Sequence, residues 1–281
     1  MIRLVCVVGG GDLAIIPHLI DHYRELGVES FQLVRHAESE GSPEYELAER
    51  YARQAGIDLF HTHLGPWDQT LNERLTEYAM SLNPDDWFVV VDQDEFHVYD
   101  RALPDLIAMC EAEGYDYVSG CLVDRVAADG EFPTINTSNL WRQFPLAGAV
   151  GAHLSRALPL KVGLARDRVR LLSGHHGAAD GRGLPHDRSY IQVHHFKWTD
   201  SVMERLRTRA HKFESGEWKA EYSEVAKEAR MVLSYIESHG GRIDIHDRSL
   251  RLQPCGASYG DHPHWKELAE EAGGWSWAIT Y

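Results

Sequence analysis

Apolar residues follow two alternating patterns through the first hundred residues of the chain. Short runs rich in Val, Ile and Phe predict buried strands, and segments with apolar residues at helical spacing separate these runs. The predicted strands cover residues 2–8, 30–36, 57–63 and 86–94, and the predicted helices cover 12–27, 44–55 and 70–82. Units of about 30 residues that alternate in this way are typical of right-handed βαβ connections.

The pattern changes in the second half, where Gly, Pro, His and Arg are frequent between residues 124 and 190. The elements predicted here are a helix over 102–114, strands over 115–123 and 190–198, and helices over 200–215 and 222–239. The aromatic tail is expected to pack against the rest of the chain through Trp265, Trp275, Trp277 and Tyr281. We therefore expect an α/β fold: a mostly parallel, twisted, Rossmann-like sheet with helices on both faces and a C-terminal helical extension.

The formal net charge of the 281-residue chain is −15 with histidine neutral. This charge repels a long polyanion, so it disfavours a nucleic-acid partner. The four cysteines include no C-x-x-C pair, and Cys6 and Cys121 lie in apolar runs, which is typical of reduced residues in a cytoplasmic protein. No apolar stretch approaches the ~20 residues that cross a bilayer, so we expect no membrane span.

Three carboxylates directly follow the predicted strand WFVVV, namely Asp92, Asp94 and Glu95. Residues two apart on an extended strand point the same way, so Asp92 and Asp94 are expected to face one point beyond the strand. The carboxyl ends of strands are where open α/β sheets bind their ligands. Two hard oxygen donors suit Mn²⁺ or Mg²⁺ and leave coordination positions for phosphate oxygens, so the sequence predicts one of these ions as the cofactor.

The stretch DWFVVVDQDEF resembles the metal motif of glycosyltransferases with the GT-A fold, specifically the family 2-like group. Residues 12–36, 68–87 and 193–206 are similar to further segments of the same group. The resemblance is good over 1–120 and 190–212 and weak between them.

This resemblance implies an enzyme that moves a sugar from a nucleotide-diphosphate donor, a UDP-sugar, to an acceptor hydroxyl with inversion. Because no membrane helix or basic amphipathic surface points to a lipid acceptor, we expect the acceptor to be a small soluble molecule. The resemblance also implies a single domain over 1–281. Residues 1–120 would form the donor half, 121–198 the acceptor half, and 199–281 the C-terminal helices and tail.

The metal ligands that the resemblance implies are Asp92, Asp94 and the late His195, whereas His194 alternates to the opposite face of its strand. The donor-binding residues that follow from it are Gly9, Gly10, Asp12, Asn72, Asp92 and Gln93. Glu95, His175 and His176 are candidates for contacts with the acceptor or the metal.

Two carboxylates are candidates for the general base that takes the proton of the acceptor hydroxyl. Asp180 lies in the Gly-rich loop 173–183, where the fold builds its acceptor side, and this position slightly favours it. Asp124 ends the predicted strand 115–123 and is the competing candidate.

Other classes of protein explain parts of the sequence. Gly9-x-Gly11-x-x-Ala14 matches a dinucleotide-binding fingerprint, and Arg35 at the end of the next strand would suit NADP, but this interpretation leaves the acidic motif unexplained. A nucleotidyltransferase would use the same carboxylates, although the glycine loop lacks the basic residue that such enzymes carry. A non-catalytic sugar-binding protein would not need an intact metal motif.

Overall fold

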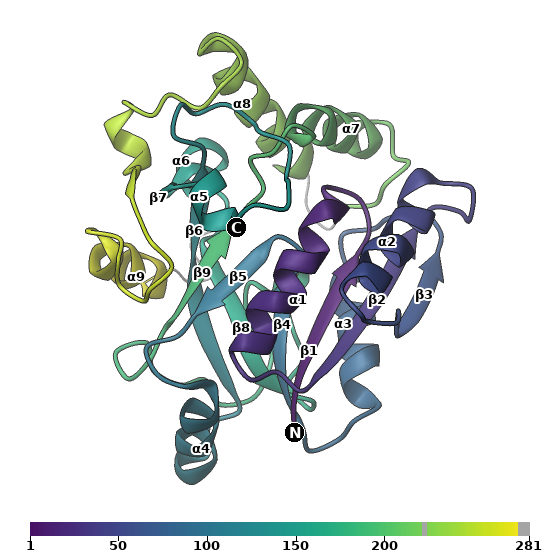
Figure 1. Ribbon diagram of the computed structural model, residues 1–281, viewed down its shortest axis with the longest axis vertical. Helices are drawn as coiled ribbons and strands as arrows, with labels where there is room; N and C mark the ends of the chain where they lie inside the picture. Colours follow the sequence, from purple (N-terminus) through teal and green to yellow (C-terminus); the bar gives the residue numbers. More distant parts are fainter. Residues whose placement is uncertain (221–223, 275–281) are drawn as a thin grey trace.

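A ten-stranded sheet crosses the part of the chain that the computed structural model describes, residues 1–220 and 224–274 (Figure 1). Its strands are β1 (Ile2–Val8), β2 (Ser30–Ala37), β3 (His61–Leu64), β4 (Trp87–Asp92), β5 (Glu95–Val98), β6 (Tyr117–Val126), β7 (Leu146–Gly148), β8 (Leu160–Arg166), β9 (Ile191–His195) and β10 (Gln253–Pro254). The helices of the chain are α1 (Ile16–Glu25), α2 (Pro43–Gln54), α3 (Leu71–Ser81), α4 (Leu103–Glu113), α5 (Leu140–Gln143), α6 (Val150–Ser155), α7 (Val202–Glu214), α8 (Glu224–Ser238) and α9 (Trp265–Gly273).

The first four strands form a parallel unit in the order β3-β2-β1-β4. A helical segment separates each strand of this unit from the next, as the alternating periods predict. The α/β fold class is therefore confirmed, and the carboxyl ends of these strands meet at one edge of the sheet.

The second half of the sheet is mixed. Strand β8 lies between β4 and β6 and is antiparallel to both. Strand β9 is parallel to β6 and antiparallel to β5, the short strand that begins with Glu95 of the acidic motif. Strands β8 and β9, from the second half of the chain, therefore lie beside β4 and β5, where the acidic motif is.

Helices cover both faces of the sheet because the strand residues alternate between two apolar clusters. On β1, Leu4 and Cys6 pack in the cluster that includes α1, α2 and α4, whereas Val5 packs with α3. In Figure 1, α1 and α2 lie in front of the sheet. The prediction of helices on both faces is confirmed.

The C-terminal extension consists of α7, α8 and α9, and α7 and α8 pack against each other. Trp265 at the start of α9 is buried beside Tyr190, as the expected packing of the tail requires. Trp275, Trp277 and Tyr281 lie outside the described residues.

Arg125 holds part of this extension in place. Its guanidinium is fully buried and donates to the carbonyl oxygens of Phe144, at 3.2 Å, and Cys255, at 2.7 Å, and also to that of Gly256. Arg125 therefore lies on the opposite face of β6 from its neighbour Asp124, and the two side chains contact different parts of the chain.

The two ends of the main strand order are short. Strand β3 has four residues, and β10 has two, one of which is Pro254. Both edges are paired on one side only along this order.

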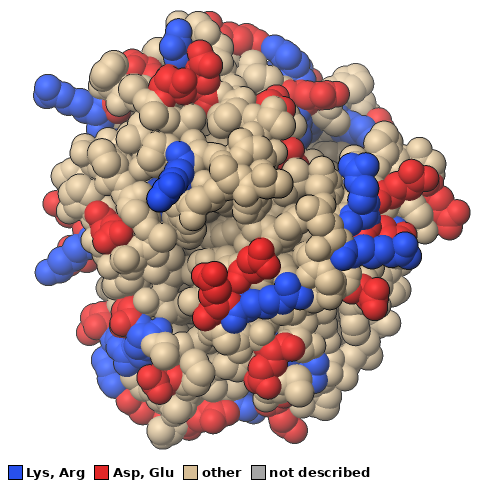
Figure 2. Space-filling model, in the orientation of Figure 1, with Lys and Arg blue, Asp and Glu red and all other residues tan. Residues whose placement is uncertain are grey.

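No helix within residues 1–220 and 224–274 is both long and apolar enough to cross a bilayer. Figure 2 shows acidic and basic side chains interspersed over one face of the molecule, with acidic groups and a basic one near a hollow at its centre.

His22 on α1 is a half-buried histidine whose protonation in acid disfavours the folded state. Its Nε2–H donates to the carbonyl oxygen of His97 at 2.9 Å, and burial lowers its pKa to about 4. The unfolded chain binds this proton near the ordinary pKa of 6.5, so stability falls as the pH drops from 7 toward 4. We expect the loss in free energy of unfolding between pH 7 and 5 to be smaller by about 1–2 kcal/mol in His22→Gln than in wild type.

Urea unfolding at both pH values measures this difference. His246→Gln, which changes an exposed histidine, is the control and should lose as much stability as wild type. An equal acid-induced loss in His22→Gln and wild type would contradict the assignment.

Candidate active site

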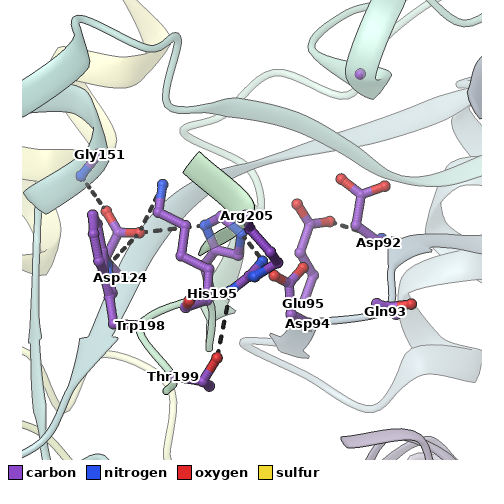
Figure 3. A network of polar contacts seen from close by, with 12 residues as sticks. Asp92, Gln93, Asp94, Glu95, Asp124, Gly151, His195, Trp198, Thr199 and Arg205 are labelled. Carbon is purple, nitrogen blue, oxygen red and sulfur yellow. Dashed lines mark hydrogen bonds and ion pairs between the residues drawn. The ribbon is translucent and has the colours of Figure 1, made fainter. Parts of the chain in front are cut away.

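The acidic motif lies in a tight turn between β4 and β5, at the carboxyl end of the parallel unit (Figure 3). Asp92 ends β4, Glu95 begins β5, and Gln93 and Asp94 form the turn between them. The buried run from Trp87 to Val91 fixes this position, because the core packs it on both faces. The predicted location of the motif at a strand end is thus what the structure shows.

Asp92 and Glu95 share one buried cation, Lys161 of β8. The Nζ atom of Lys161 is 2.7 Å from Asp92 Oδ2 and 2.9 Å from Glu95 Oε1. Although burial opposes ionisation, Lys161 holds the pKa of Asp92 far below its usual value. Burial and the charge of Asp92 outweigh the same lysine at Glu95 and raise the pKa of that carboxyl to about 7.

Asp94 faces a different partner. Its Oδ2 lies 3.5 Å from Nε2 of His195 at the end of β9, and Nδ1 of the same ring lies 3.3 Å from Asp124 Oδ1. The three side chains form a row in Figure 3. Burial lowers the pKa of His195, but Asp94 and Asp124 together overcome this effect and raise it to about 9.

Asp124 of β6 has a partner at each oxygen. Its Oδ2 accepts the backbone N–H of Gly151 at 2.5 Å, and its Oδ1 accepts Trp198 Nε1–H at 3.2 Å and faces Lys197 Nζ at 3.6 Å. Burial opposes its ionisation, but Lys197, His195 and the N–H of Gly151 together hold its pKa well below the usual range. The geometry therefore gives Asp124 the task of orienting His195.

His194 points to the other face of β9, as the alternation predicts. Arg125 Nε–H donates to His194 Nδ1 at 2.9 Å, and the ring packs edge-on against Trp141 with centroids 4.8 Å apart. His194 is fully buried in this network. Of the two adjacent histidines, His195 is the one that faces the acidic motif.

The glycine loop after β1 is fastened to the same motif. Gln93 Oε1 accepts the backbone N–H of Gly9 at 3.1 Å, and Gln93 Nε2–H donates to the carbonyl oxygen of Gly10 at 2.8 Å. A side chain at Gly9 would collide with the backbone of His36, so only glycine lets the ends of β1 and β2 approach this closely. Of the donor-binding candidates, Gln93 brings Gly9 and Gly10 to the site through direct contacts.

The remaining two donor-binding candidates, Asn72 and Asp12, lie next to the acidic motif and the glycine loop. Asn72 on α3 donates from Nδ2 to Asp92 Oδ1 at 2.8 Å. Asp12 follows the glycine loop, and its Oδ2 accepts Ser201 Oγ–H at 3.3 Å from the segment that leads into α7. Asp12 makes no capping hydrogen bond to the helical turn that follows.

Aromatic rings gather beside the glycine loop at the ends of β2 and β3. His36 stacks on His63 with centroids 6.0 Å apart and packs edge-on against Trp67 at 5.2 Å. His63 belongs to the His61-x-His63 pair, whose other ring contacts Tyr78. The two rings of this pair thus make different aromatic contacts.

Two basic residues beside the row formed by Asp94, His195 and Asp124 are not among the predicted site residues. Arg205 on α7 donates from Nε to Ser201 Oγ at 3.0 Å and lowers the pKa of Asp94 together with His195, although burial opposes this. Lys197 follows β9 and pairs with Asp124. Both basic residues lie within residues 193–206, a segment of the resemblance, so the sequence could have indicated them as basic residues near the site.

The loop of residues 173–183 divides between the site and the surface. His175 is fully buried, with Nδ1 3.7 Å from Asp92 Oδ1, and His176 Nδ1–H donates to the carbonyl oxygen of Leu160 at 2.7 Å. Asp180 lies at the exposed end of the loop, where its Oδ2 accepts Arg170 Nε–H at 2.8 Å. The structure brings His175 to the motif and pairs Asp180 with a surface arginine.

The donor set at Asp94 and His195 fits a divalent cation. An oxygen and a nitrogen 3.5 Å apart are close enough to be neighbours in one coordination shell, and Asp124 accepts from the other ring nitrogen, as a carboxylate beside a metal-bound histidine does. Nowhere in the described part of the chain do three His, Cys, Asp or Glu side chains converge as a complete metal cage. Two protein ligands suit an ion that also binds substrate phosphates.

No protein-family model matches the chain, and no curated protein matches it either. Among solved structures, it is similar to S. aureus TarS at 12% identity and a TM-score of 0.35, over 85% of this chain and 43% of that chain. The structure of S. aureus TarS 1-349 in complex with UDP-GlcNAc matches at 12% identity and a TM-score of 0.37, over 96% of this chain and 80% of that one. The chain thus spans less than half of the longer TarS structure, and its function is argued below from its own residues.

The contact between His195 and Asp124 is testable without any substrate. Replacing the carboxylate by an amide removes a negative charge at 3.3 Å from the ring, so the pKa of His195 should fall. We expect Asp124→Asn to lower this pKa by about one pH unit or more in metal-free protein, followed by NMR of the ring protons.

Asp180→Asn is the comparison, because that carboxylate pairs with Arg170 at the surface. It should leave the His195 titration unchanged. An unaltered pKa in Asp124→Asn would show that the carboxylate does not control this ring.

Proposed function

We propose that this chain is a metal-dependent glycosyltransferase that moves a sugar from a UDP-sugar donor to a hydroxyl of a small soluble acceptor, with inversion. One observation carries the proposal: Asp94 and His195 converge at the carboxyl end of the parallel sheet, beside the glycine loop and two basic side chains. Ligands of α/β sheets bind at this edge.

A divalent cation held by Asp94 and His195 would neutralise the charge that develops on the departing nucleoside diphosphate. Asp124 keeps the His195 ring in the orientation that presents Nε2 to this point. Arg205 beside Asp94 and Lys197 beside Asp124 add positive charge to the site, which would further stabilise an anionic leaving group. The net charge of −15 makes this local positive charge necessary for a diphosphate to bind.

The donor nucleotide would lie over the glycine loop, because Gln93 holds Gly9 and Gly10 beside the acidic motif. The rings of His36, His63 and Trp67 at the next strand ends offer flat surfaces on which a nucleobase can stack. Asp92, with its side chain one third exposed, lies between this group and the loop of residues 173–176. This order supports a sugar site near Asp92 and an acceptor site near the loop.

Each of the two candidates for the general base already has partners that disfavour proton transfer. Asp124 adjoins His195, but both of its oxygens already have donors and its pKa is strongly lowered. Asp180 is exposed but paired with Arg170. Removing a base lowers turnover by roughly a hundredfold or more, so we compare turnover in Asp124→Asn and Asp180→Asn at saturating donor and acceptor. A variant that loses turnover but keeps the wild-type affinity for UDP and Mn²⁺ identifies the base, whereas a loss of that affinity in Asp124→Asn reports the displaced His195 ring.

We expect wild-type protein to bind UDP in the presence of Mn²⁺ and to lose this metal-dependent binding in Asp94→Ala and His195→Ala. The loss should be at least roughly tenfold in Kd, since each variant removes one of only two protein ligands of the cation. Isothermal titration calorimetry with Mn²⁺ and UDP measures binding, and release of UDP from a panel of UDP-sugars measures turnover.

The matched controls are Asp21→Ala and His246→Ala, which change an exposed carboxylate and an exposed imidazole elsewhere on the chain. Both should bind UDP as wild type does. Unchanged affinity in Asp94→Ala would refute the metal assignment. Release of pyrophosphate from a nucleoside triphosphate, without release of UDP from any UDP-sugar, would favour a nucleotidyltransferase.

A further inference from the structure

Lys161 is a lysine inside the sheet, in a place where an unpaired ammonium would be strongly unfavourable. It belongs to β8, and its side chain is 2% exposed. Its Nζ atom meets Asp92 Oδ2 at 2.7 Å, Glu95 Oε1 at 2.9 Å and the carbonyl oxygen of Gly174 at 2.7 Å. An ammonium has three N–H donors, and here each has an acceptor. The position is therefore built around a positive charge.

The same two carboxylates have donors at their remaining oxygens. Asn72 Nδ2–H donates to Asp92 Oδ1 at 2.8 Å, and the backbone N–H of Asp92 donates to Glu95 Oε2 at 3.1 Å. All four oxygens of Asp92 and Glu95 are thus engaged by the chain itself. Asp94 differs, because the partner of its carboxylate is the imidazole of His195 at 3.5 Å.

We propose that Lys161 is a positioning residue that serves as a resident cation for Asp92 and Glu95, so that only Asp94 and His195 are left to hold a divalent metal. Two protein ligands form an incomplete shell, and such an ion keeps its other positions for water and phosphate oxygens. The metal therefore binds together with the diphosphate of the donor and not before it. This order of binding rests on the proposed function, whereas the role of Lys161 at the two carboxylates does not.

Lys161 also joins the motif to the loop of residues 173–176. The carbonyl that it holds belongs to Gly174, which has φ +64°, and the next residue, His175, has the left-handed φ of +59° that non-glycine residues seldom adopt. Within the described residues, neither ring nitrogen of the buried His175 has a hydrogen-bond partner. A contact from Lys161 on one side and the hydrogen bond of His176 to Leu160 on the other hold this conformation.

The test is the affinity for Mn²⁺ alone, without any nucleotide. Lys161→Met keeps the length of the side chain and removes its charge, so Asp92 and Glu95 become free to bind a cation. We expect Lys161→Met to bind Mn²⁺ at least roughly tenfold more tightly than wild type, because added carboxylate ligands raise affinity for a hard cation. Electron paramagnetic resonance of free Mn²⁺ measures both proteins.

Lys212→Met is the matched control. Lys212 on α7 also lies between two carboxylates, those of Glu38 and Glu217, but these are not part of the acidic motif. The Lys212→Met variant should bind Mn²⁺ with the same affinity as wild type. Equal affinities in Lys161→Met and wild type would overturn the proposal, as would tight binding of Mn²⁺ by wild type that Asp92→Asn abolishes.

Lys161→Met leaves the buried Glu95 and the partly exposed Asp92 without their cation, so its thermal midpoint should fall. If it does not fold, Lys161→Met combined with Glu95→Gln keeps the test open, because it removes one of the two charges and still frees Asp92. This double variant should bind Mn²⁺ more tightly than Glu95→Gln alone, and the absence of such a gain would equally overturn the proposal.

A second titration separates this inference from the proposed function. In wild type, UDP should raise the affinity for Mn²⁺ at least roughly tenfold, since it supplies the missing oxygen ligands. If UDP has no effect but Lys161→Met still gains affinity for Mn²⁺ alone, the donor assignment fails and the role of Lys161 stands. If UDP raises the affinity for Mn²⁺ as expected but Lys161→Met binds Mn²⁺ no more tightly than wild type, the donor assignment stands and the role of Lys161 fails.

Discussion

Three carboxylates at the end of one buried strand need positive charge from elsewhere in the chain, and this requirement organises the site. None of the compensating groups is local in sequence. Lys161 comes from β8, His195 from β9 and Arg205 from α7. Because like charges in a buried environment repel strongly, the motif is stable only when these distant elements are in place. The fold and the site thus stabilise each other.

The mixed half of the sheet is what makes this compensation possible. Strand β8 inserts antiparallel beside β4 and carries its lysine under the motif, while β9 lies parallel to β6 and pairs with β5. In this arrangement Glu95 and Asp124 both stand opposite His195 in the strand registers. A purely parallel sheet would place helices, and not a second set of strands, where these side chains meet.

Local sequence patterns predict the parallel half and the acidic end of β4 well, since period and strand ends depend on neighbouring residues. They also separate His195 from His194, because alternation along a strand needs no tertiary information. Lys161 could not be found in this way: the apolar strand LKVGLA contains the lysine, but its carboxylate partners are about 70 residues away. The exposed position of Asp180 depends on how its loop folds, which no spacing reveals.

The ends of the main strand order also bear on how the protein behaves at high concentration. An open sheet edge is a template for pairing with another chain, and long apolar edges promote aggregation. Here β3 offers four residues, and β10 offers two, one of them Pro254, which lacks an N–H to donate. Neither end presents a ladder long enough to recruit a second sheet. The fold therefore keeps a wide sheet from growing further by edge-to-edge association at these two ends.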